Sequence, residues 1–489
     1  MRRHLLALTA LASLAACDRE TVTSLRPAPR AASLSLSASG AAQYLVEFKG
    51  NKLPSDLDAR ATALGASVVD TIGELGVAII GGVTSSAAAT LASQSDVATL
   101  LADVTVQPPS TQWRVTQTAV EDTLAVVPMS VTHPELAAAF ALQWNMRVIG
   151  ADHAWAAGLL GSPDVRLAII DAGIDPRLPD VGPLVDPTRS TSFCPADNPA
   201  IAQFFPGFPT WTDIEGHGTY VAAIAASRAR LVAGVTSRTT LMAVKAFSQA
   251  GCPFSAVFQA MQYAADHGAD VMNMSLGVVD LLPKNELQGF AHFFHLFAQY
   301  AFHRGVSAIV VAAGNEGVDL QHSGNGFDVF CDVPGVICVS ATGPTSAGPN
   351  SVGPFVNIDA PAFYSQFGAS AIDVAAPGGN AGFDAAGHVT GVGLLYSSCA
   401  STTLVLDHGV FHPNACTGSF NFVLGALGTS GASPHVAGLA ALLVSQLGRG
   451  NQAQVRAIIE QTADDLGKPG NDQFYGRGRI NVARAAGVP

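Results

Sequence analysis

The chain has 489 residues, of which 48% are hydrophobic and 13% are charged. This balance excludes a disordered chain and provides enough apolar side chains for a large core. The net charge of −12 lacks the basic excess that binds phosphates, so we expect no nucleic-acid partner. At about 100–200 residues per domain, the length predicts two to four domains, or one large domain with additions.

The first 17 residues are typical of a secretory signal. A short basic start, Met1 to His4, precedes the apolar run Leu5–Ala16, which is too short to span a bilayer. The run ends in Leu-Ala-Ala-Cys, which resembles a bacterial lipobox whose cysteine, here Cys17, is lipidated. We therefore predict export from a bacterial cell, with the protein either secreted or anchored through Cys17. The alternative is an ordinary signal peptide with a chance cysteine. No later apolar run is long enough to predict a transmembrane span.

The next part of the chain predicts a tether and a small domain. Residues 18–41 are rich in Ser and Ala and predict a flexible tether. Residues 42–106 predict a small α+β domain. Its strands are expected at 44–48, 67–72, 76–80 and 104–106, and its helices at 56–65 and 85–94. Residues 107–143 contain four prolines and no clear element, and therefore predict a linker.

The pattern changes in residues 144–489, where short β-branched runs alternate with longer helical stretches. Strands are expected at 165–170, 240–247, 271–275, 308–312 and 336–341, and helices at 221–227, 255–267 and 285–304. Apolar strands alternating with helices predict an α/β fold, a doubly wound, mostly parallel sheet with helices on both faces. In such sheets the active site lies at the carboxyl ends of the strands.

The cysteines support export. Without Cys17 there are six, an even number that predicts disulfides with 15 possible pairings. Cys331 and Cys338 flank a Pro-Gly turn and form the most local pair. Cys399 and Cys416 are the next most local, and Cys194 with Cys252 follows by elimination. Free buried thiols remain the alternative. The chain has no Cys-x-x-Cys pair, so a zinc ribbon is not supported.

Three residues suggest nucleophilic catalysis when they are considered together. Asp171 ends a buried-type strand, His217 lies between two glycines before a helix, and Ser430 opens an apolar helix. Each alone fits a structural role, for example a helix cap at the serine. Together they provide a hydroxyl nucleophile, an imidazole that takes its proton and a carboxylate that holds the imidazole. Their order along the chain matches one of the known Asp-His-Ser triad orders.

Around these residues the chain resembles the subtilisin-like serine peptidases, the subtilase family. The resemblance rests on Asp171-x-Gly, His217-Gly-Thr and Gly-Thr-Ser430-x-Ala-x-Pro, together with Ala-Ala-Gly-Asn315 and Asn-Met-Ser275-Leu-Gly. The end of the chain, Tyr-Gly-Arg-Gly-Arg-Ile-Asn, is also similar to the family's last turn and helix. These motifs cover about residues 144–486 and imply a subtilisin-like fold and serine endopeptidase activity.

The resemblance assigns roles to single residues. It implies that Ser430 attacks the peptide carbonyl, that His217 is the general base and that Asp171 orients His217. It makes Asn315 the side-chain donor to the oxyanion, although Gly-Asn is also a common turn pair. It implies substrate binding by the following residues: Ser275, Leu276, Gly277, Ala313 and Gly314.

The resemblance also implies a zymogen. Residues 42–106 are similar to the family's inhibitory propeptide, which acts as an intramolecular partner and is cut off within residues 107–143. We expect protein and peptide substrates, broad specificity with an apolar or aromatic residue before the cut, and tolerance of a basic one near Glu316. Catalysis needs no cofactor; structural calcium is implied, with ligands unassigned, and we expect a monomer. The alternative function is a catalytically silent protein of this fold that only binds peptides.

Four features depart from the family pattern. Ala172 replaces the usual Ser or Thr after the aspartate, Tyr220 replaces a common His, and Gly431 replaces the usual Met after the nucleophile. Residues 396–424 also form a longer approach to the nucleophile. None of these departures removes a proton-transfer group or an oxyanion donor, so we still expect activity.

Overall fold

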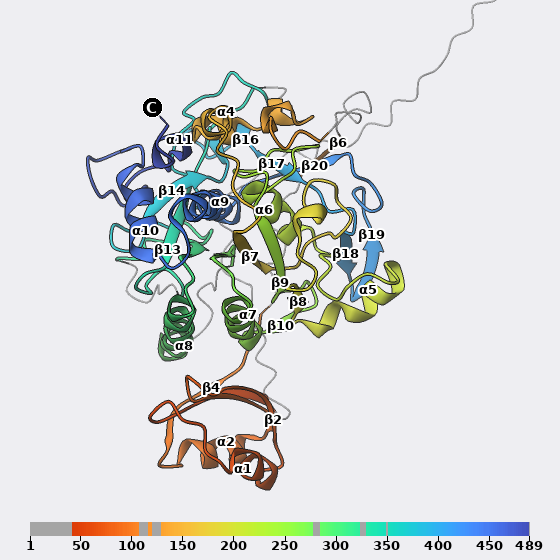
Figure 1. Cartoon of the computed structure of the whole chain (residues 1–489), viewed down its shortest axis with the longest axis vertical. Helices are drawn as coiled ribbons and strands as arrows, with labels where there is room; N and C mark the ends of the chain where they lie inside the picture. The colour runs from red at the N-terminus through yellow and green to blue at the C-terminus, as the bar shows by residue number, and fades with distance from the viewer. Residues whose placement is uncertain are drawn as a thin grey trace, which may run out of the picture.

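The computed structural model describes residues 42–106, 116–119, 129–276, 284–322, 329–348 and 351–488. The signal segment with Cys17, the tether and Gly277 lie outside these residues. Figure 1 shows a large body that contains the central sheet and a smaller body below it, formed by the N-terminal residues.

The small body, residues 42–106, is an antiparallel sheet with two helices on its outer face. Its sheet has the strand order β2-β3-β1-β4, with β1 Ala42–Phe48, β2 Ser67–Ile72, β3 Val77–Val83 and β4 Val97–Ala102. The helices are α1 (Leu57–Ala63) and α2 (Ser85–Ala92). Strand β4 was not predicted from the sequence because Val97–Ala102 has no regular alternation of buried and exposed residues. The expected strand at 104–106 is β5 (Thr105–Val106), which pairs with the large body instead.

The large body contains a sheet of seven strands in the order β14-β13-β12-β11-β7-β9-β8, and all neighbouring pairs are parallel. Its strands are β7 Arg166–Asp171, β8 Thr191–Ser192, β9 Thr240–Lys245, β11 Val271–Met274, β12 Ala308–Ala312, β13 Ile337–Thr342 and β14 Val374–Pro377. Strands that follow β7 along the chain lie on both sides of it, so the sheet is doubly wound, as predicted. Ligands of such sheets bind where the winding reverses, which places the carboxyl ends of β7 and β11 at the expected site.

Alternate residues of each central strand face opposite layers of helices. Leu167 and Ile169 of β7 contact the core beneath α6 (His217–Ala225) and α9 (Thr429–Leu447), whereas Ala168 and Ile170 contact the core beneath α7 (Ser255–Asp266) and α8 (Lys284–His303). Both faces are therefore buried, which explains why the strand sequences are almost continuously apolar. The helix expected at 221–227 begins earlier, at His217, because Gly216 takes a left-handed conformation there.

The remaining elements surround this core. The other α-helices are α3 (Trp144–Val148), α4 (Ala151–Ala156), α5 (Asn198–Phe204), α10 (Gln452–Gln461) and α11 (Val482–Ala485). Short 3-10 helices lie at Pro134–Leu136, Phe140–Leu142, Gly182–Leu184 and Pro195–Asp197. The remaining strands are β6 Thr116–Ala119, β10 Cys252–Pro253, β15 Asn380–Phe383, β16 Val389–Gly393, β17 Leu395–Ser398, β18 Leu404–Asp407, β19 Val410–Pro413 and β20 Phe422–Ala426.

The segment interpreted as a linker has structure in both of its described parts, residues 116–119 and 129–143. Strand β6 pairs with β20 at the edge of a three-stranded sheet. Phe140 is buried in the core of the large body, and the Gln143 side chain exchanges hydrogen bonds with the backbone of Ala233. The large body therefore includes residues before 144 as well.

The structure contains three disulfides, which join the six cysteines in the pairs favoured from the sequence. The Cα–Cα distances are 5.5 Å for Cys194–Cys252, 5.1 Å for Cys331–Cys338 and 6.1 Å for Cys399–Cys416. All three lie in the large body. Such bonds persist in oxidising compartments outside the cytosol.

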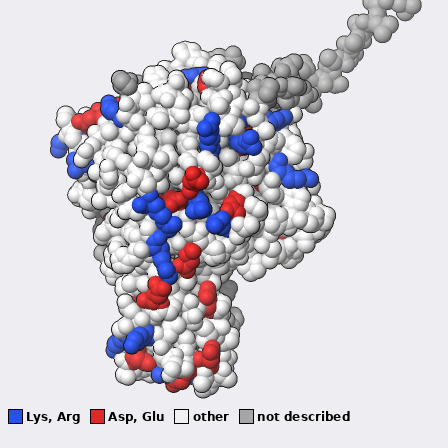
Figure 2. All heavy atoms as spheres, viewed as in Figure 1, with Lys and Arg blue, Asp and Glu red and all other residues white. Residues whose placement is uncertain are grey.

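The surface carries few charges. On the face drawn in Figure 2, most of the large body is uncharged, and acidic and basic side chains are interspersed around the junction of the two bodies. Within the described ranges, no helix combines the length and apolar character needed to cross a membrane.

Candidate active site

Asp171 and His217 meet at the carboxyl end of β7. Asp171 is fully buried as the last residue of this strand, and its Oδ1 lies 2.8 Å from Nδ1 of His217, the first residue of α6. Two glycines allow this approach, because a β-carbon on Gly218 would lie 2.1 Å from the carbonyl oxygen of Gly173. The backbones of the Asp-x-Gly and His-Gly-Thr motifs are thus in direct contact.

Asp213 fixes the start of the histidine helix. Its Oδ1 accepts the N–H groups of Glu215 and Gly216, and its Oδ2 accepts the N–H and hydroxyl of Thr219. A carboxylate at a helix N-terminus satisfies free N–H groups and interacts favourably with the helix dipole. Sequence reasoning missed Asp213, although an Asp shortly before an apolar helix is a helix-start signal.

The charges around His217 favour its protonated form. Burial alone would lower the pKa of His217, but the charge and hydrogen bond of Asp171 outweigh it, helped by the charges of Glu215 and Asp213, and raise this pKa to about 9. The side chain remains 29% exposed, so the imidazole is accessible from the surface. A histidine of this kind becomes an efficient base only in alkaline solution.

Ser430 lies in the first turn of α9, where the helix meets the end of β11. Its Oγ is 3.5 Å from the carbonyl oxygen of Ser275, the residue after β11. The hydroxyl of Ser275 in turn donates to the carbonyl of Ser430 at 2.9 Å and contacts Oγ of Ser433 at 2.7 Å. Among the described contacts there is no hydrogen bond between Ser430 and His217; in unliganded sites such bonds are often long and shorten when substrate binds.

Asn315 is held in one orientation by the residue before the nucleophile. Its Oδ1 accepts the backbone N–H of Thr429 at 2.8 Å and the hydroxyl of Thr429 at 2.9 Å. Because both of these groups donate, the oxygen must face Thr429 and the Nδ2 amide is left to donate elsewhere. Thr429 also accepts the N–H of Gly314 at 3.1 Å, which joins this loop to the start of α9. Sequence reasoning included Thr429 only as part of a motif.

The other expected substrate-binding residues lie near these groups. Ala313 is buried directly after β12, and Gly314 follows it with a φ of 100°. Leu276 is partly buried and contacts the core under α7 and α8. Gly277 lies outside the described residues.

The departures from the family pattern have visible consequences. Ala172 contributes only its backbone N–H, which donates to Oδ1 of Asp171 at 2.7 Å, and Oδ2 of Asp171 has no hydrogen-bond partner. The Tyr220 hydroxyl donates to the carbonyl oxygen of Leu395 at 3.1 Å, so it joins α6 to β17. Burial raises the pKa of this phenol far above its usual value, so Tyr220 stays neutral.

The long approach to the nucleophile, residues 396–424, packs on the loops next to Asp171 and His217, the catalytic dyad candidates. Ser401 donates its N–H and hydroxyl to Oδ2 of Asp175, four residues after Asp171. The Thr402 hydroxyl donates to the carbonyl of Asp213, and the N–H of Leu404 donates to the carbonyl of Ile214 at 2.8 Å. We call residues 399–416, closed by the Cys399–Cys416 disulfide, the clamp segment.

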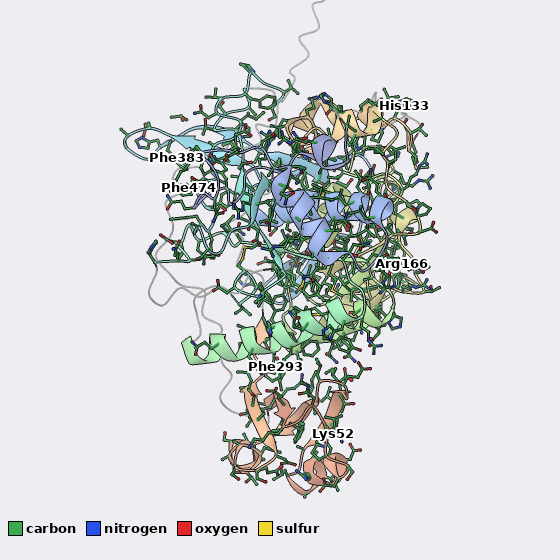
Figure 3. The ribbon with its side chains drawn as sticks, turned by 60° about the vertical axis from the view of Figure 1, so that its left-hand side comes forward. Lys52, His133, Arg166, Phe293, Phe383 and Phe474 are labelled. Carbon is green, nitrogen blue, oxygen red and sulfur yellow. A yellow bond between two sulfur atoms is a disulfide. The ribbon has the colours of Figure 1, made fainter. Side chains whose placement is uncertain are left out.

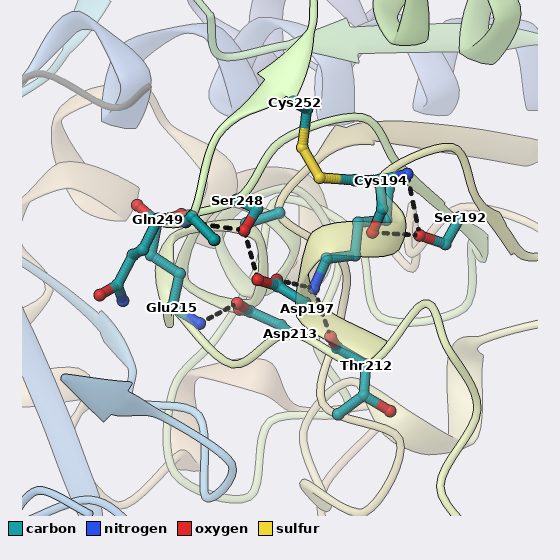
Figure 4. A network of polar contacts seen from close by, with 12 residues as sticks. Ser192, Cys194, Asp197, Thr212, Asp213, Glu215, Ser248, Gln249 and Cys252 are labelled. Atoms are coloured by element: carbon teal, nitrogen blue, oxygen red, sulfur yellow. Dashed lines mark hydrogen bonds and ion pairs between the residues drawn. A yellow bond between two sulfur atoms is a disulfide. The ribbon is translucent and has the colours of Figure 1, made fainter. Parts of the chain in front are cut away.

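A buried polar network lies beneath the histidine loop (Figure 4). Lys245, at the end of β9, is fully buried; its Nζ lies 2.6 Å from Oδ2 of Asp197 and 2.8 Å from the carbonyl oxygen of Thr212. Asp197 also accepts the Ser248 hydroxyl. Sequence reasoning did not identify this network, because its members are far apart along the chain.

Metal ligands were left unassigned from the sequence. In the part of the chain that the structure describes, no group of three His, Cys, Asp or Glu residues could hold a metal ion. One deeply buried carboxylate, Asp180, instead accepts the backbone N–H groups of Arg230 and Leu231 and the hydroxyl of Ser227. These donors satisfy the carboxylate without a cation.

Comparison with known proteins places most of this chain in one family. A family model described as the subtilase family matches residues 162–478. The thermophilic serine proteinase of Bacillus sp. (strain AK1) is 32% identical over 338 residues, which are 68% of this chain and 64% of that protein, just under two thirds of its length. Thermitase of Thermoactinomyces vulgaris is 28% identical over 347 residues, 70% of this chain and 95% of thermitase. Subtilisin E of Bacillus subtilis (strain 168) is 31% identical over 333 residues, 67% of each chain.

Solved structures share the fold over most of the chain. The epidermin leader peptide processing serine protease of Staphylococcus aureus has a TM-score of 0.63 at 21% identity, and the match covers 92% of this chain and 99% of that one. Fervidolysin of Fervidobacterium pennivorans has a TM-score of 0.61 at 21% identity, with 92% of this chain and 61% of fervidolysin covered.

Proposed function

Because the chain belongs to the subtilase family of serine peptidases, we propose that it is an exported endopeptidase made as a zymogen that uses Asp171, His217 and Ser430 as its triad. The observation that carries this proposal is the 2.8 Å contact between Asp171 and His217 at the sheet edge where Ser430 opens α9. The three disulfides support export, since they form outside the reducing cytosol.

The proposed reaction is acyl transfer to water. Ser430 Oγ attacks the peptide carbonyl while His217 takes its proton, and Asp171 stabilises the resulting imidazolium. The oxyanion receives hydrogen bonds from the Asn315 amide, whose orientation Thr429 fixes, and from the backbone N–H of Ser430. His217 then gives its proton to the leaving amine. Water hydrolyses the acyl-serine by the same steps in reverse.

We propose that the small body is the inhibitory propeptide. Figures 1 and 3 place its sheet against α7 and α8. Oδ1 of Asp103 accepts the N–H of Ser255 at the start of α7, so a carboxylate of the small body caps a helix of the large one. His292 on α8 contacts Glu47 at 2.8 Å, and Arg304, directly after this helix, contacts Glu74 at 2.7 Å.

The end of the small body supports this role. Strand β5 pairs antiparallel with β10, with Val106 opposite Cys252, so an extended segment already lies along a strand of the large body. Peptides that add a strand to a sheet edge are bound mainly through their backbone, which tolerates many sequences. A cut beyond residue 133 would separate residues that are buried in the large body, so we place the processing site before Pro134.

The test compares the purified chain with Ser430→Ala. We expect the wild type to shorten itself before residue 134 and to digest casein, while the variant keeps its full length. Loss of the nucleophile should lower turnover by roughly 10⁴–10⁶-fold, the scale known for subtilisin itself. If both proteins stay inert and a fluorophosphonate labels neither, the proposal is wrong and peptide binding without turnover becomes the better description.

A further inference from the structure

The ion pair between Lys245 and Asp197 is a buried feature that the proposed reaction does not use. Both side chains are shielded from water, with exposed fractions of 0% and 1%, and the ammonium lies 2.6 Å from Oδ2 of the carboxylate (Figure 4). Taking two charges out of water costs free energy that their attraction repays only when the geometry is good, so a buried pair is weak evidence for stability. The other contacts of Lys245 indicate what the pair does for the active site.

Lys245 lies directly opposite Asp171 in the sheet. The two are register partners on the parallel strands β9 and β7, and the N–H of Ala246 donates to the carbonyl of Asp171 at 2.9 Å. Each is the last residue of its strand. The side chain of Lys245 consequently starts from the same end of the sheet that carries the catalytic aspartate.

The ammonium of Lys245 reaches the loop before the histidine helix. Nζ donates to the carbonyl oxygen of Thr212 at 2.8 Å, and among the hydrogen bonds of the described residues this carbonyl accepts from Lys245 alone. A hydrogen bond from a charged donor is roughly twice as strong as one between neutral groups. The carbonyl belongs to the peptide unit that Thr212 shares with Asp213, so this bond also fixes the backbone of Asp213.

Asp213 connects this loop to His217. Its carboxylate accepts four hydrogen bonds from the start of α6, and His217 is the first residue of that helix. Burial raises the pKa of Asp213, and the charge of Lys245 is among the groups that oppose this rise, so it favours the ionised form that accepts all four bonds. The end of the sheet and the start of the helix are thus joined through Lys245, Thr212 and Asp213.

The two backbone hydrogen bonds between the loop after Asp171 and the loop before His217 are long. The N–H of Ile174 donates to the carbonyl of Trp211, and the N–H of Asp213 donates to the carbonyl of Ile174, both at 3.3 Å. Typical bonds of this type measure about 2.9–3.0 Å. The charged contact from Lys245 is therefore better suited to hold the loop against the sheet.

We propose that Lys245 is a positioning residue for the catalytic histidine. Its ammonium holds the loop at Thr212 against the sheet and so sets the spacing of Asp171 and His217. The inference rests on the proposed peptidase function and deepens it. Without this link the start of α6 should shift relative to β7, and a displacement of about 1 Å at a catalytic group costs about a hundredfold in rate.

The test removes the ion pair in two steps and measures activity separately from stability. Lys245→Met leaves Asp197 buried without a cation, so it should lower both the unfolding temperature and kcat. Lys245→Met/Asp197→Asn leaves no unpaired charge and should be more stable than the single variant. Its kcat for an uncharged peptide should nevertheless stay about ten- to a hundredfold below that of the wild type, with KM changed less than about threefold, because Thr212 still has no donor.

The pH profile of kcat/KM is a second readout. Against the effect of burial, the charge and hydrogen bond of Asp171 raise the pKa of His217 to about 9, and the charges of Glu215 and Asp213 add to this rise. If the double variant displaces His217 from Asp171, this pKa falls and the rise of kcat/KM should occur at lower pH than in the wild type. The two removed charges are opposite and adjacent, so their own effects on His217 largely cancel. A pair with only a structural role would leave the profile unchanged.

The matched control is the ion pair of Arg456 and Asp373. Arg456 donates to Asp373 and, at 2.7 Å, to the carbonyl of Val336, so it too joins a carboxylate and a backbone carbonyl. These two acceptors directly precede β14 and β13, at the end of the sheet opposite the active site. Arg456→Met/Asp373→Asn should therefore lower the unfolding temperature and leave kcat and the pH profile unchanged.

The outcomes separate this inference from the proposed function. Fluorophosphonate titration counts active sites, and unfolding is measured in the Ser430→Ala background. If Lys245→Met/Asp197→Asn regains wild-type kcat together with stability, or keeps the wild-type pH profile, the inference is wrong while the peptidase function stands. A double variant that does not fold would assign Lys245 to folding and would also overturn the inference. If the wild type cleaves no peptide at all, the proposed function itself fails.

Discussion

The hydroxyl of Tyr220 lies 3.3 Å from the position that a β-carbon on Gly431 would occupy. Tyr220 belongs to the histidine helix α6, and Gly431 follows the nucleophile on α9. Both residues depart from the family pattern, which has His and Met at these positions. The two departures are thus one exchange, in which a larger side chain on α6 fills space left by the missing side chain on α9.

This exchange predicts energetic coupling between the two positions. Gly431→Met should crowd Tyr220 and destabilise the large body by about 1–3 kcal/mol. Tyr220→His should also destabilise it, because the bond to Leu395 is lost and space remains beside Gly431. The double variant should be more stable than the sum of the single effects, by about 1 kcal/mol or more. Unfolding in the Ser430→Ala background measures this without autolysis; purely additive effects would contradict it.

A second prediction concerns the orientation of Asn315. Thr429→Val removes the hydroxyl that donates to Asn315 Oδ1 at 2.9 Å but keeps the backbone bond at 2.8 Å. We expect kcat to fall by about tenfold with little change in KM, because the amide matters only when the oxyanion forms. Thr429→Ser keeps the hydroxyl and should stay close to wild type. A change in KM alone would argue against this positioning role.

The sequence predicted the parts of this structure that rest on local pattern. The apolar strand Val165–Ile170 and the residues Asp171, His217 and Ser430 are recognisable because each stands in a short motif. The structure brings Asp171 and His217 into contact and places Ser430 at the expected sheet edge. Both faces of β7 are buried, and the continuous apolar run that results explains why this strand was easy to predict.

Other features depend on contacts between distant segments and could not be predicted. The buried Oε2 of Glu215 has no hydrogen-bond partner, a feature that no sequence pattern reveals. The ion pair between Lys245 and Asp197 joins residues 48 positions apart, whose meeting requires the folded sheet. The sequence of strand β4 has no regular alternation of apolar and polar residues, and only the pairing with β1 identifies it as a strand.

The raised pKa of His217 predicts alkaline activity. His217 must be neutral to accept the Ser430 proton, so kcat/KM should rise with pH up to about 9. Glu215→Gln removes a negative charge that stabilises the imidazolium, and the rise should then occur at lower pH. Initial rates with an uncharged peptide between pH 5 and 11 measure both profiles. A rise near pH 6.5 in both proteins would show that the surrounding charges do not act as described.

A fourth prediction concerns the missing donor beside Asp171. Its Oδ2 is buried without a partner, and Ala172 offers no hydroxyl. Ala172→Ser supplies one next to the carboxylate, and a hydrogen bond to a charged group contributes about 1.5–3 kcal/mol at best. We expect the variant to unfold at higher temperature in the Ser430→Ala background and to cleave peptides several-fold faster. Ala172→Val adds volume without a donor, and equal gains from both would exclude the hydrogen bond as the cause.

The clamp segment predicts that a disulfide outside the triad supports catalysis. Removing the Cys399–Cys416 disulfide opens the loop that it closes and frees the clamp segment. Ser401 and Leu404 of this segment bind the loops after Asp171 and before His217. The double variant Cys399→Ser/Cys416→Ser should lose about 3 kcal/mol of stability, the scale for closing a loop of this size. We also expect kcat to fall by about tenfold, since small displacements of the dyad are costly.

The matched control is Cys331→Ser/Cys338→Ser, which opens a loop of sequence separation 7 rather than 17. Its cysteines flank the start of β13, away from the clamp segment, so this variant should lose stability with little change in kcat. Both variants are compared by thermal unfolding and by kcat per active site titrated with a fluorophosphonate. If the two lower kcat equally, the effect is a general loss of stability. If only the first does so, residues 399–416 position the catalytic dyad through the contacts of Ser401 and Leu404.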